Sequence, residues 1–334
     1  MPPAGLSPIM RRRRLGTDLR RLREAAGLTG EQVIAAVGWA SASKLSRLEN
    51  GRSRPDPDDV RALLDLYGAD EATGAELLDI ARQAGDMRGW LKKYPVMTPQ
   101  QRIFAELEAG CTEIREYNPV LVPGLLQTQG YARLRIVSAQ QVESGVGDPE
   151  PDAVPEPPPA PVAPETQMAA RLARQSRLLR ADAPHYTAVL EEAALGRRAG
   201  PPEVLREQLR QLAELAGQPH VTLHVLPREA RIGEWYLPPT AFSIYLFADP
   251  LDPETLAIEG DFTNAMSTEA NTVNRYKVAF EWLRAAALSA SDTVTWLFEE
   301  SERLVEAGEP STAAHGSATA PPQRRRHSGR LTDR

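Results

Sequence analysis

Through the first quarter of the chain, apolar residues recur at helical spacing between residues that start and stop helices. Gly27 and Gly38 are placed to end helices in the left-handed conformation, and Thr29 and Ser41 are placed to cap the helices that follow. The pattern predicts five short helices: one over 16–26, one after Thr29, one after Ser41, one opened by Pro55 and Pro57, and one over 71–84. Together their apolar positions suffice for a small core.

Beyond residue 98 the pattern mixes helical and strand periods. Apolar stripes predict helices near 99–116, 127–137, 166–181, 203–216, 270–289 and 291–306. Alternating or continuous apolar runs predict strands at 186–190, 221–226 and 241–247, with a short one at 256–258. We therefore expect an α+β domain over 99–306, joined to the helices by a connector at 85–98.

Proline content and charge mark the segments outside these domains. Eight prolines lie between residues 149 and 164, and residues 141–165 include acids but no bases. Such a composition cannot form a packed core, so we expect a disordered, proline-rich insertion at 141–165. We also expect a basic flexible arm over 1–14 and a disordered tail over 307–334.

Length, cysteine content and hydropathy limit the class of protein. The 334 residues suit one small and one medium domain. The single cysteine, Cys111, excludes an intramolecular disulfide, and no apolar stretch approaches the roughly 18 residues of a membrane span. We therefore expect a soluble, cytoplasmic protein that does not bind membranes.

The charge is distributed unevenly along the chain. The formal net charge is −6, but residues 11–54 hold eleven Arg or Lys against four acids, a net +7, which leaves −13 for the rest. A basic module on an acidic body is expected when one module binds nucleic-acid phosphates and the other does not.

Residues 29–51 have the pattern of a helix-turn-helix, in which the second helix lies in the major groove. Leu45 and Leu48 must face the core, which leaves a polar face outward. The candidate DNA-binding residues are Ser41, Ala42, Ser43, Lys44, Ser46, Arg47, Arg52 and Arg54. We expect Arg47 to bond guanine, the serines to contact bases or phosphates, and Lys44, Arg52 and Arg54 to contact phosphate. The alternative is a solvated arginine-rich surface. For Arg11–Arg14, insertion into the minor groove competes with an unstructured tail.

Two motifs in this region carry a family resemblance. Leu19-Arg-Arg-Leu-Arg-Glu-Ala-Ala-Gly-Leu-Thr29 and Ser43-Lys-Leu-Ser-Arg-Leu-Glu-Asn-Gly51, followed by Arg54-Pro55, resemble the XRE family of phage-repressor-like regulators. The resemblance implies an all-α, five-helix, lambda-repressor-like domain over 15–84 with groove contacts from Ser43, Lys44 and Arg47. The chain departs from the family at Gly30, where many members have a phosphate-contacting Gln, and at Trp39-Ala40, which lengthens the turn slightly.

A second resemblance covers the larger domain. Glu113-Ile-Arg-Glu-Tyr-Asn-Pro-Val-Leu-Val-Pro-Gly-Leu-Leu-Gln-Thr128, Arg171-Leu-Ala-Arg-Gln175 and Leu190-Glu-Glu-Ala-Ala-Leu195 resemble the domain of unknown function that actinobacterial XRE-type regulators carry behind the DNA module. With the first domain, the resemblance spans residues 16 to about 290. It implies an antitoxin-like regulator working with a small partner protein encoded nearby.

We consider three candidate functions. The leading one is a sequence-specific transcriptional regulator that binds double-stranded operator DNA as a homodimer, with half-sites about 34 Å apart, and whose larger domain senses a ligand or small partner. The alternative is an antitoxin-like interaction protein that sequesters the partner and uses DNA binding for autoregulation. The third, an enzyme, lacks a recognisable catalytic constellation, so we expect no catalysis and no cofactor.

Four other features have weaker chemical interpretations. His220 and His224 lack a convincing third metal ligand, and Cys111 is expected to be buried rather than nucleophilic. Glu191-Glu192 is more typical of solvated or capping carboxylates than of a catalytic pair. Pro123-Gly-Leu-Leu126 either lines a pocket or partner groove or forms a plain core turn, which is the commoner outcome.

Overall fold

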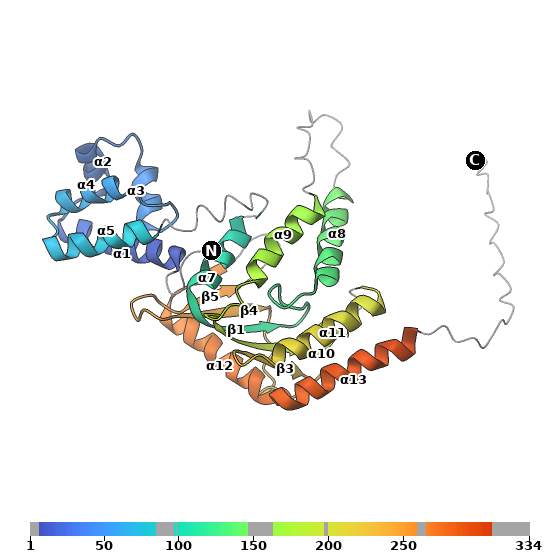
Figure 1. Ribbon diagram of the computed structural model, residues 1–334. Helices are drawn as coiled ribbons and strands as arrows, with labels where there is room; N and C mark the ends of the chain where they lie inside the picture. The colour runs from blue at the N-terminus through green and yellow to red at the C-terminus, as the bar shows by residue number, and fades with distance from the viewer. Residues whose placement is uncertain are drawn as a thin grey trace, which may run out of the picture.

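The computed structural model describes residues 7–84, 97, 99–145, 163–196, 200–258 and 265–308. Four parts of the predicted segments lie outside the described residues. They are residues 1–6 of the arm predicted over 1–14, the connector at 85–98 except residue 97, residues 146–162 of the insertion, and residues 309–334 of the tail predicted over 307–334. Two units follow each other along the chain: a helical domain at one end of the molecule and a larger domain built on a six-stranded sheet (Figure 1).

The N-terminal domain has the five predicted helices. They are α1 (Pro8–Ala25), α2 (Gly30–Val37), α3 (Ala42–Glu49), α4 (Pro57–Tyr67) and α5 (Glu71–Gln83). The local signals operate as expected: Thr29 forms a capping box with Gln32, the Ser41 side chain accepts from the Ser43 amide, and Gly38 is left-handed at φ 69°. Leu15, Leu19 and a ring of apolar residues from the other helices form the core.

Helix α1 corrects one boundary. It begins at Pro8 rather than near residue 16, so Arg11–Arg14 belong to a helix and the prediction of an arm reaching to residue 14 was wrong. Pro8 suits the first helical turn because its missing N–H has no intrahelical partner there. The arginines continue the helix because Ile9 and Met10 before them and Leu15 after them are buried.

The larger domain is α+β, as predicted. Its sheet has the order β3-β2-β1-β4-β5-β6, with β1, β2 and β3 parallel and the remaining pairs antiparallel. The strands are β1 (Cys111–Asn118), β2 (His185–Glu191), β3 (Val221–Leu226), β4 (Phe242–Phe247), β5 (Thr255–Ile258) and β6 (Ala265–Ser267). The helices are α7 (Pro99–Gly110), α8 (Gln129–Gly145), α9 (Pro164–Gln175), α10 (Glu192–Leu195), α11 (Pro202–Ala216), α12 (Ala270–Ala286) and α13 (Ala290–Gly308).

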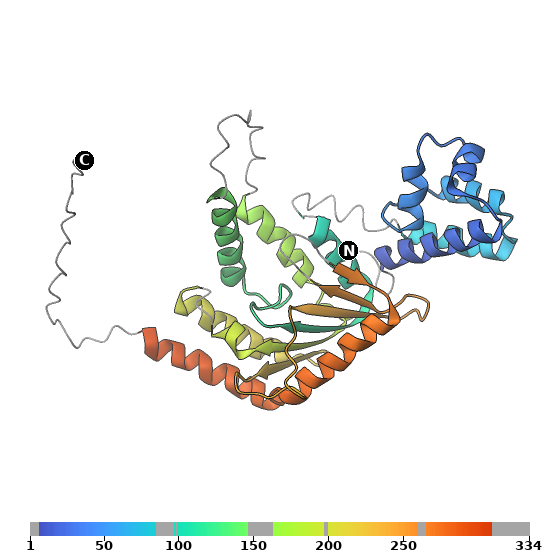
Figure 2. The same cartoon turned by 180° about the vertical axis from the view of Figure 1, so that it is seen from behind.

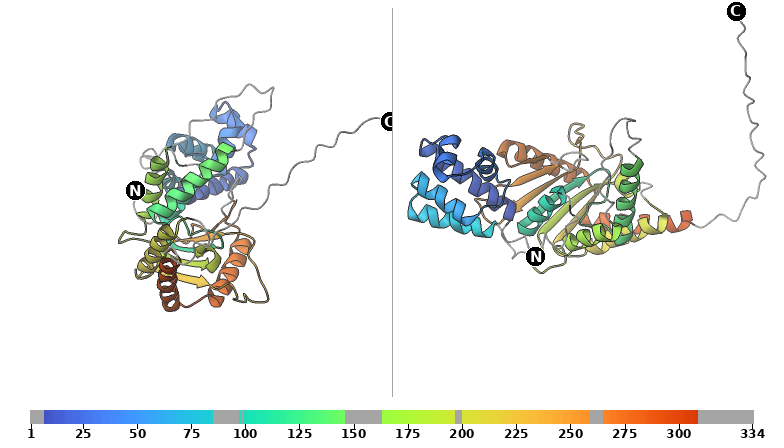
Figure 3. Two further views of the ribbon diagram at one scale, coloured as in Figure 1. Left: turned by 90° about the vertical axis from the view of Figure 1, so that its right-hand side faces the viewer. Right: turned by 90° about the horizontal axis from the view of Figure 1, so that it is seen from above.

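Helices cover both faces of the sheet. Leu212 of α11 and Leu297 of α13 are fully buried in the core that includes Tyr186 of β2. Phe280 of α12 packs in a separate core on the other face, with Phe242 of β4. The view along the sheet shows α12 on one side and the paired α11 and α13 on the other (Figure 3, left; also Figure 2).

The helix expected over 99–116 was wrong in its second half, because residues 111–118 form the central strand β1. The apolar residues Cys111, Ile114 and Tyr117 are three apart, which imitates a helical stripe. In the strand, Ile114 packs into one core and Tyr117 into the other, and a register shift between Cys111 and Glu113 restores Cys111 to the first face. The short strand β6 was also missed. Residues 141–145 and 164–165 of the predicted insertion are helical, in α8 and α9.

Candidate nucleic-acid interface

The helix-turn-helix consists of α2, a turn over residues 38–41, and α3. Gly38 reverses the chain in the left-handed conformation, and the Trp39 amide donates to the Ile34 carbonyl at 3.0 Å, which closes the end of α2. Ser41 then starts α3, while Leu45 and Leu48 hold its inner face in the core. The short turn fixes the angle between the two helices, as this motif requires.

The predicted residues lie on the outer face of α3, at its cap and just beyond its end. Seven of the eight candidates are exposed: Ser41, Ala42, Ser43, Ser46, Arg47, Arg52 and Arg54. The Arg47 guanidinium donates to the Ser43 hydroxyl at 2.5 Å, one helical turn earlier, so the donor lies along the exposed face. The role of these residues in reading DNA stays a prediction.

Lys44 differs from the other candidates. Its ammonium lies 2.7 Å from the Asp59 carboxylate of α4 and 4.3 Å from the centre of the Trp39 ring. The ion pair ties α3 to α4, and the contact with the ring holds Trp39 of the turn against α3. The structure therefore gives Lys44 a role in fixing the angle of α3, and a phosphate contact would have to compete with Asp59.

Glu49, which the sequence reasoning did not single out, anchors the end of α3. Its carboxylate is buried and accepts from Arg23 at 2.6 Å and Arg20 at 3.2 Å, both from α1. The hydrogen bond that Arg23 donates to Glu49 raises the pKa of Arg23 above its ordinary value. Burial, and secondarily the Glu49 charge, raises the pKa of Tyr67 to about 12. The Glu in the Leu-Glu-Asn-Gly motif was the available signal.

The basic residues of segment 11–54 divide into two groups. Seven of the eleven form ion pairs with carboxylates: Arg11, Arg12, Arg14, Arg20, Arg21, Arg23 and Lys44. Within the described ranges, Arg13, Arg47, Arg52 and Arg54 have no such pair. Burial, followed by repulsion from Arg12 and Arg52, lowers the pKa of Arg13.

Gly16 and Gly51 allow α1 to pass close to the end of α3. A Cβ on Gly16 would lie 2.5 Å from the Glu49 carbonyl oxygen, and one on Gly51 would lie 2.9 Å from the Arg13 Cα. Gly51 also has a φ of 64°, in the left-handed region. Both glycines thus bring the backbones of α1 and the end of α3 into contact.

In the larger domain, the Pro123-Gly-Leu-Leu126 segment is a core turn, because Leu125 and Leu126 are buried. Glutamine side chains satisfy its backbone. Gln208 donates to the Leu126 carbonyl at 2.8 Å and accepts from the Thr128 amide at 2.7 Å, and Gln175 donates to the Gly124 carbonyl at 2.9 Å. The sequence of this turn is therefore explained by its burial and by the hydrogen bonds to its backbone.

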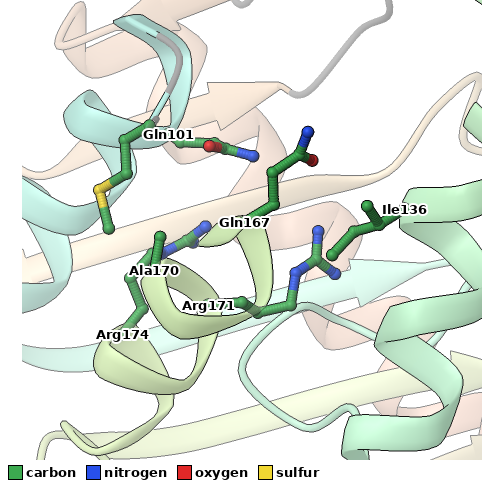
Figure 4. Close-up of a pocket in the computed structure, with 7 residues that line it drawn as sticks. Gln101, Ile136, Gln167, Ala170, Arg171 and Arg174 are labelled. Atoms are coloured by element: carbon green, nitrogen blue, oxygen red, sulfur yellow. The ribbon is translucent and has the colours of Figure 1, made fainter. Parts of the chain in front are cut away.

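A small cavity lies between α7, α8 and α9 (Figure 4). Met97, Gln101, Ile136, Gln167, Ala170, Arg171 and Arg174 line it, and it encloses about 10 Å³. That is roughly the room for one water molecule. Arg174 is held by the buried Glu108 carboxylate, with its Nε 3.0 Å from Oε2. In this conformation the cavity has no room for an organic effector.

The remaining candidates have structural partners. His220 and His224 bond the carbonyls of Leu178 and Leu288 at 2.8 and 2.9 Å, and Glu191 accepts from Tyr117 at 2.8 Å. Burial raises the pKa of the Cys111 thiol far above its ordinary value. Among the residues that the structure describes, no group of three or more His, Cys, Asp or Glu could hold a metal ion. No helix in the described ranges is long and apolar enough to cross a membrane.

Protein-family models match both domains, whereas no curated protein and no solved structure matches the chain. The family model of a helix-turn-helix domain matches residues 14–77, which supports a DNA-binding regulator. The family model described as a domain of unknown function, DUF5753, matches residues 101–299, more than half of the chain. The chain therefore belongs to the DUF5753 family, with a helix-turn-helix domain before the family's domain.

Proposed function

We propose that this protein is a sequence-specific transcriptional regulator of the XRE type that reads operator DNA with the outer face of α3 and binds it as a homodimer in the cytoplasm. One observation carries the proposal: α3 holds its apolar residues in the core and presents Ser43, Ser46 and Arg47 to solvent. Arginine is suited to bidentate recognition of guanine in the major groove. Arg52 and Arg54, exposed beyond the helix, suit phosphate.

The test compares binding to the protein's own promoter fragment and to a scrambled duplex at two salt concentrations. We expect Arg47→Ala to lose about 1–3 kcal/mol of the preference for the promoter. Arg52→Ala should weaken binding to both duplexes alike. It should also make the slope of log affinity against log salt shallower by about 0.9, the contribution of one phosphate contact. Arg61→Ala on α4 is the matched control, because it removes an exposed arginine that pairs with Asp58 away from α3.

Either of two results would contradict base reading by α3. One is equal binding of the wild type to both duplexes with loss of all binding at high salt. The other is a loss of preference in Arg61→Ala as large as in Arg47→Ala. Either result would move attention to the larger domain.

For that domain we propose a binding role without catalysis: it senses a ligand or a small partner protein. The exposed apolar surface favours a protein partner over a small molecule. Trp235 and Leu237 are 77% and 78% exposed on the loop before β4, and Trp282 of α12 lies against that loop. Exposed apolar patches mark interaction sites. The antitoxin-like alternative uses the same surface to sequester the partner.

Titration with a purified small partner protein, of the kind that the family resemblance implies is encoded nearby, decides between the regulator and the antitoxin-like alternative. Under the regulator proposal, binding of that protein changes operator affinity. Under the antitoxin-like alternative, it also blocks the small protein's own activity at equimolar ratio. Trp235→Ser should weaken either interaction, while Leu251→Ser, which removes an exposed leucine elsewhere in the domain, should not.

A further inference from the structure

Helix α1 belongs to both domains at once. Ile9 and Met10 in its first turn are buried in the core of the larger domain, with Leu107 of α7. Leu15 and Leu19, further along the same helix, are fully buried in the helix-turn-helix core. Met10 and Leu15 are five residues apart, which is about 7.5 Å along the helix axis. No Gly or Pro lies between them, so the two cores share one stiff element.

Ion pairs reinforce this shared helix. Arg11 is 4% exposed, and its guanidinium lies 3.0 Å from the Asp249 carboxylate and 3.6 Å from that of Asp252, both in the loop after β4. Arg14 lies 3.3 Å from the same Asp249 and also pairs with Glu76 of α5. Asp249 therefore ties the larger domain to α1, and Arg14 extends the tie to α5.

A second tie lies on another side of the helix. Arg12 pairs with the buried Glu106 of α7. The Ser7 hydroxyl donates to the Glu106 carbonyl oxygen at 3.1 Å, so the start of α1 is fixed to α7 by both groups. Backbone and side-chain contacts on two sides oppose both bending and rotation of α1 relative to the sheet.

We infer that Arg11 and Arg14, through Asp249, are positioning residues for DNA reading. They fix the orientation of the helix-turn-helix module on the larger domain, so that a dimer joined through its larger domains would present its two α3 helices at one separation. The protein then selects operators by the spacing of two half-sites as well as by their bases. The spacing part rests on the proposed function; the fixed orientation does not.

The orientation is tested by distance measurement in the full chain. Spin labels go on Arg61→Cys in α4 and Val278→Cys in α12, two exposed positions, while the native Cys111 is buried. Dilution with unlabelled chains removes distances between subunits. We expect one narrow distance distribution in the parent, the labelled protein with native Arg11 and Arg14. The double variant Arg11→Gln/Arg14→Gln should give a broad one. Arg21→Gln, which breaks an exposed pair with Asp18 inside α1, is the control and should stay narrow.

The spacing is tested with duplexes carrying one half-site, two half-sites at the natural spacing, or two with about 5 base pairs inserted, half a helical turn. The parent should lose about tenfold or more of its affinity on insertion. The double variant should lose most of that discrimination yet bind the single half-site as the parent does. A purely structural role would instead weaken binding to all three duplexes equally.

Asp249→Asn is the second variant, for use if the double variant does not fold. It removes the shared acceptor while Arg11 keeps Asp252 and Arg14 keeps Glu76, so the distribution should broaden to an intermediate degree. A broad distribution in the parent, or narrow ones in both variants, overturns the fixed orientation. Equal affinity of the parent for both spacings overturns spacing selection. If the parent prefers no duplex, the proposed function fails, and the distances alone decide the orientation.

Discussion

Replacing Gly16 with alanine tests how closely α1 and α3 approach each other. A Cβ at this position would lie 2.5 Å from the Glu49 carbonyl oxygen and 2.6 Å from that of Leu48. Both distances are below the 3.0 Å that real Cβ contacts essentially never show, and both neighbours are backbone atoms that cannot rotate away. Either α1 or the end of α3 must therefore move.

The magnitude follows from two opposing effects. Overpacking costs typically 1–3 kcal/mol, and alanine in a helix interior regains up to about 1 kcal/mol over glycine. We expect Gly16→Ala to lower the free energy of unfolding by about 1–2 kcal/mol in urea titrations followed by circular dichroism. Gly74→Ala in α5 is the matched control, because a Cβ there meets no atom within 4 Å and only the helical gain of up to about 1 kcal/mol applies. Stabilisation by both substitutions would refute the close approach.

Three further predictions concern stability. Thr29→Ala removes the acceptor of the Gln32 amide and should cost about 1 kcal/mol in urea titrations, while Thr29→Ser should cost less; equal losses would contradict the cap. The buried Tyr67 hydroxyl has no hydrogen-bond partner among the described residues, so Tyr67→Phe should stabilise by roughly 1 kcal/mol, and a loss of that size would contradict this. Burial raises the pKa of Asp252 above 3.8, so its protonated form favours folding and this contribution is lost as the pH rises through the raised pKa. The free energy of unfolding of the wild type, measured relative to that of Asp252→Asn, should therefore fall as the pH rises from acid to neutral; a difference that does not change with pH would refute the shift.

Elements fixed by local signals could be predicted from the sequence. The caps at Thr29 and Ser41 and the left-handed glycines gave the N-terminal helices to within a few residues, except at the start of α1. Strand β3, a continuous apolar run, was predicted with its observed bounds, 221–226. Each of these signals lies within one or two turns of the residues it affects.

Elements decided by distant contacts could not be predicted. Residues 111–118 form a strand because β2 and β4 flank them on both sides, and no local feature separates their spacing from that of a helix. The role of the arginine run depends on Asp249 and Glu106, which lie far along the chain. Among the candidate contacts, the exposed face of α3 followed from the positions of Leu45 and Leu48, whereas the engagement of Lys44 by Asp59 did not.

Contacts with distant residues also change the interpretation of the uneven charge. A net +7 over residues 11–54 suggests many phosphate contacts, yet only Arg13, Arg47, Arg52 and Arg54 in that segment lack an ion pair among the described residues. Each neutralised phosphate contributes about −0.9 to the slope of log affinity against log salt. Binding to a single half-site should therefore give a slope no steeper than about −4, against about −10 if all eleven Arg and Lys side chains contacted phosphate. A measured slope near the second value would mean that the ion pairs of α1 open when DNA binds, and the fixed orientation of the module would then fail with them.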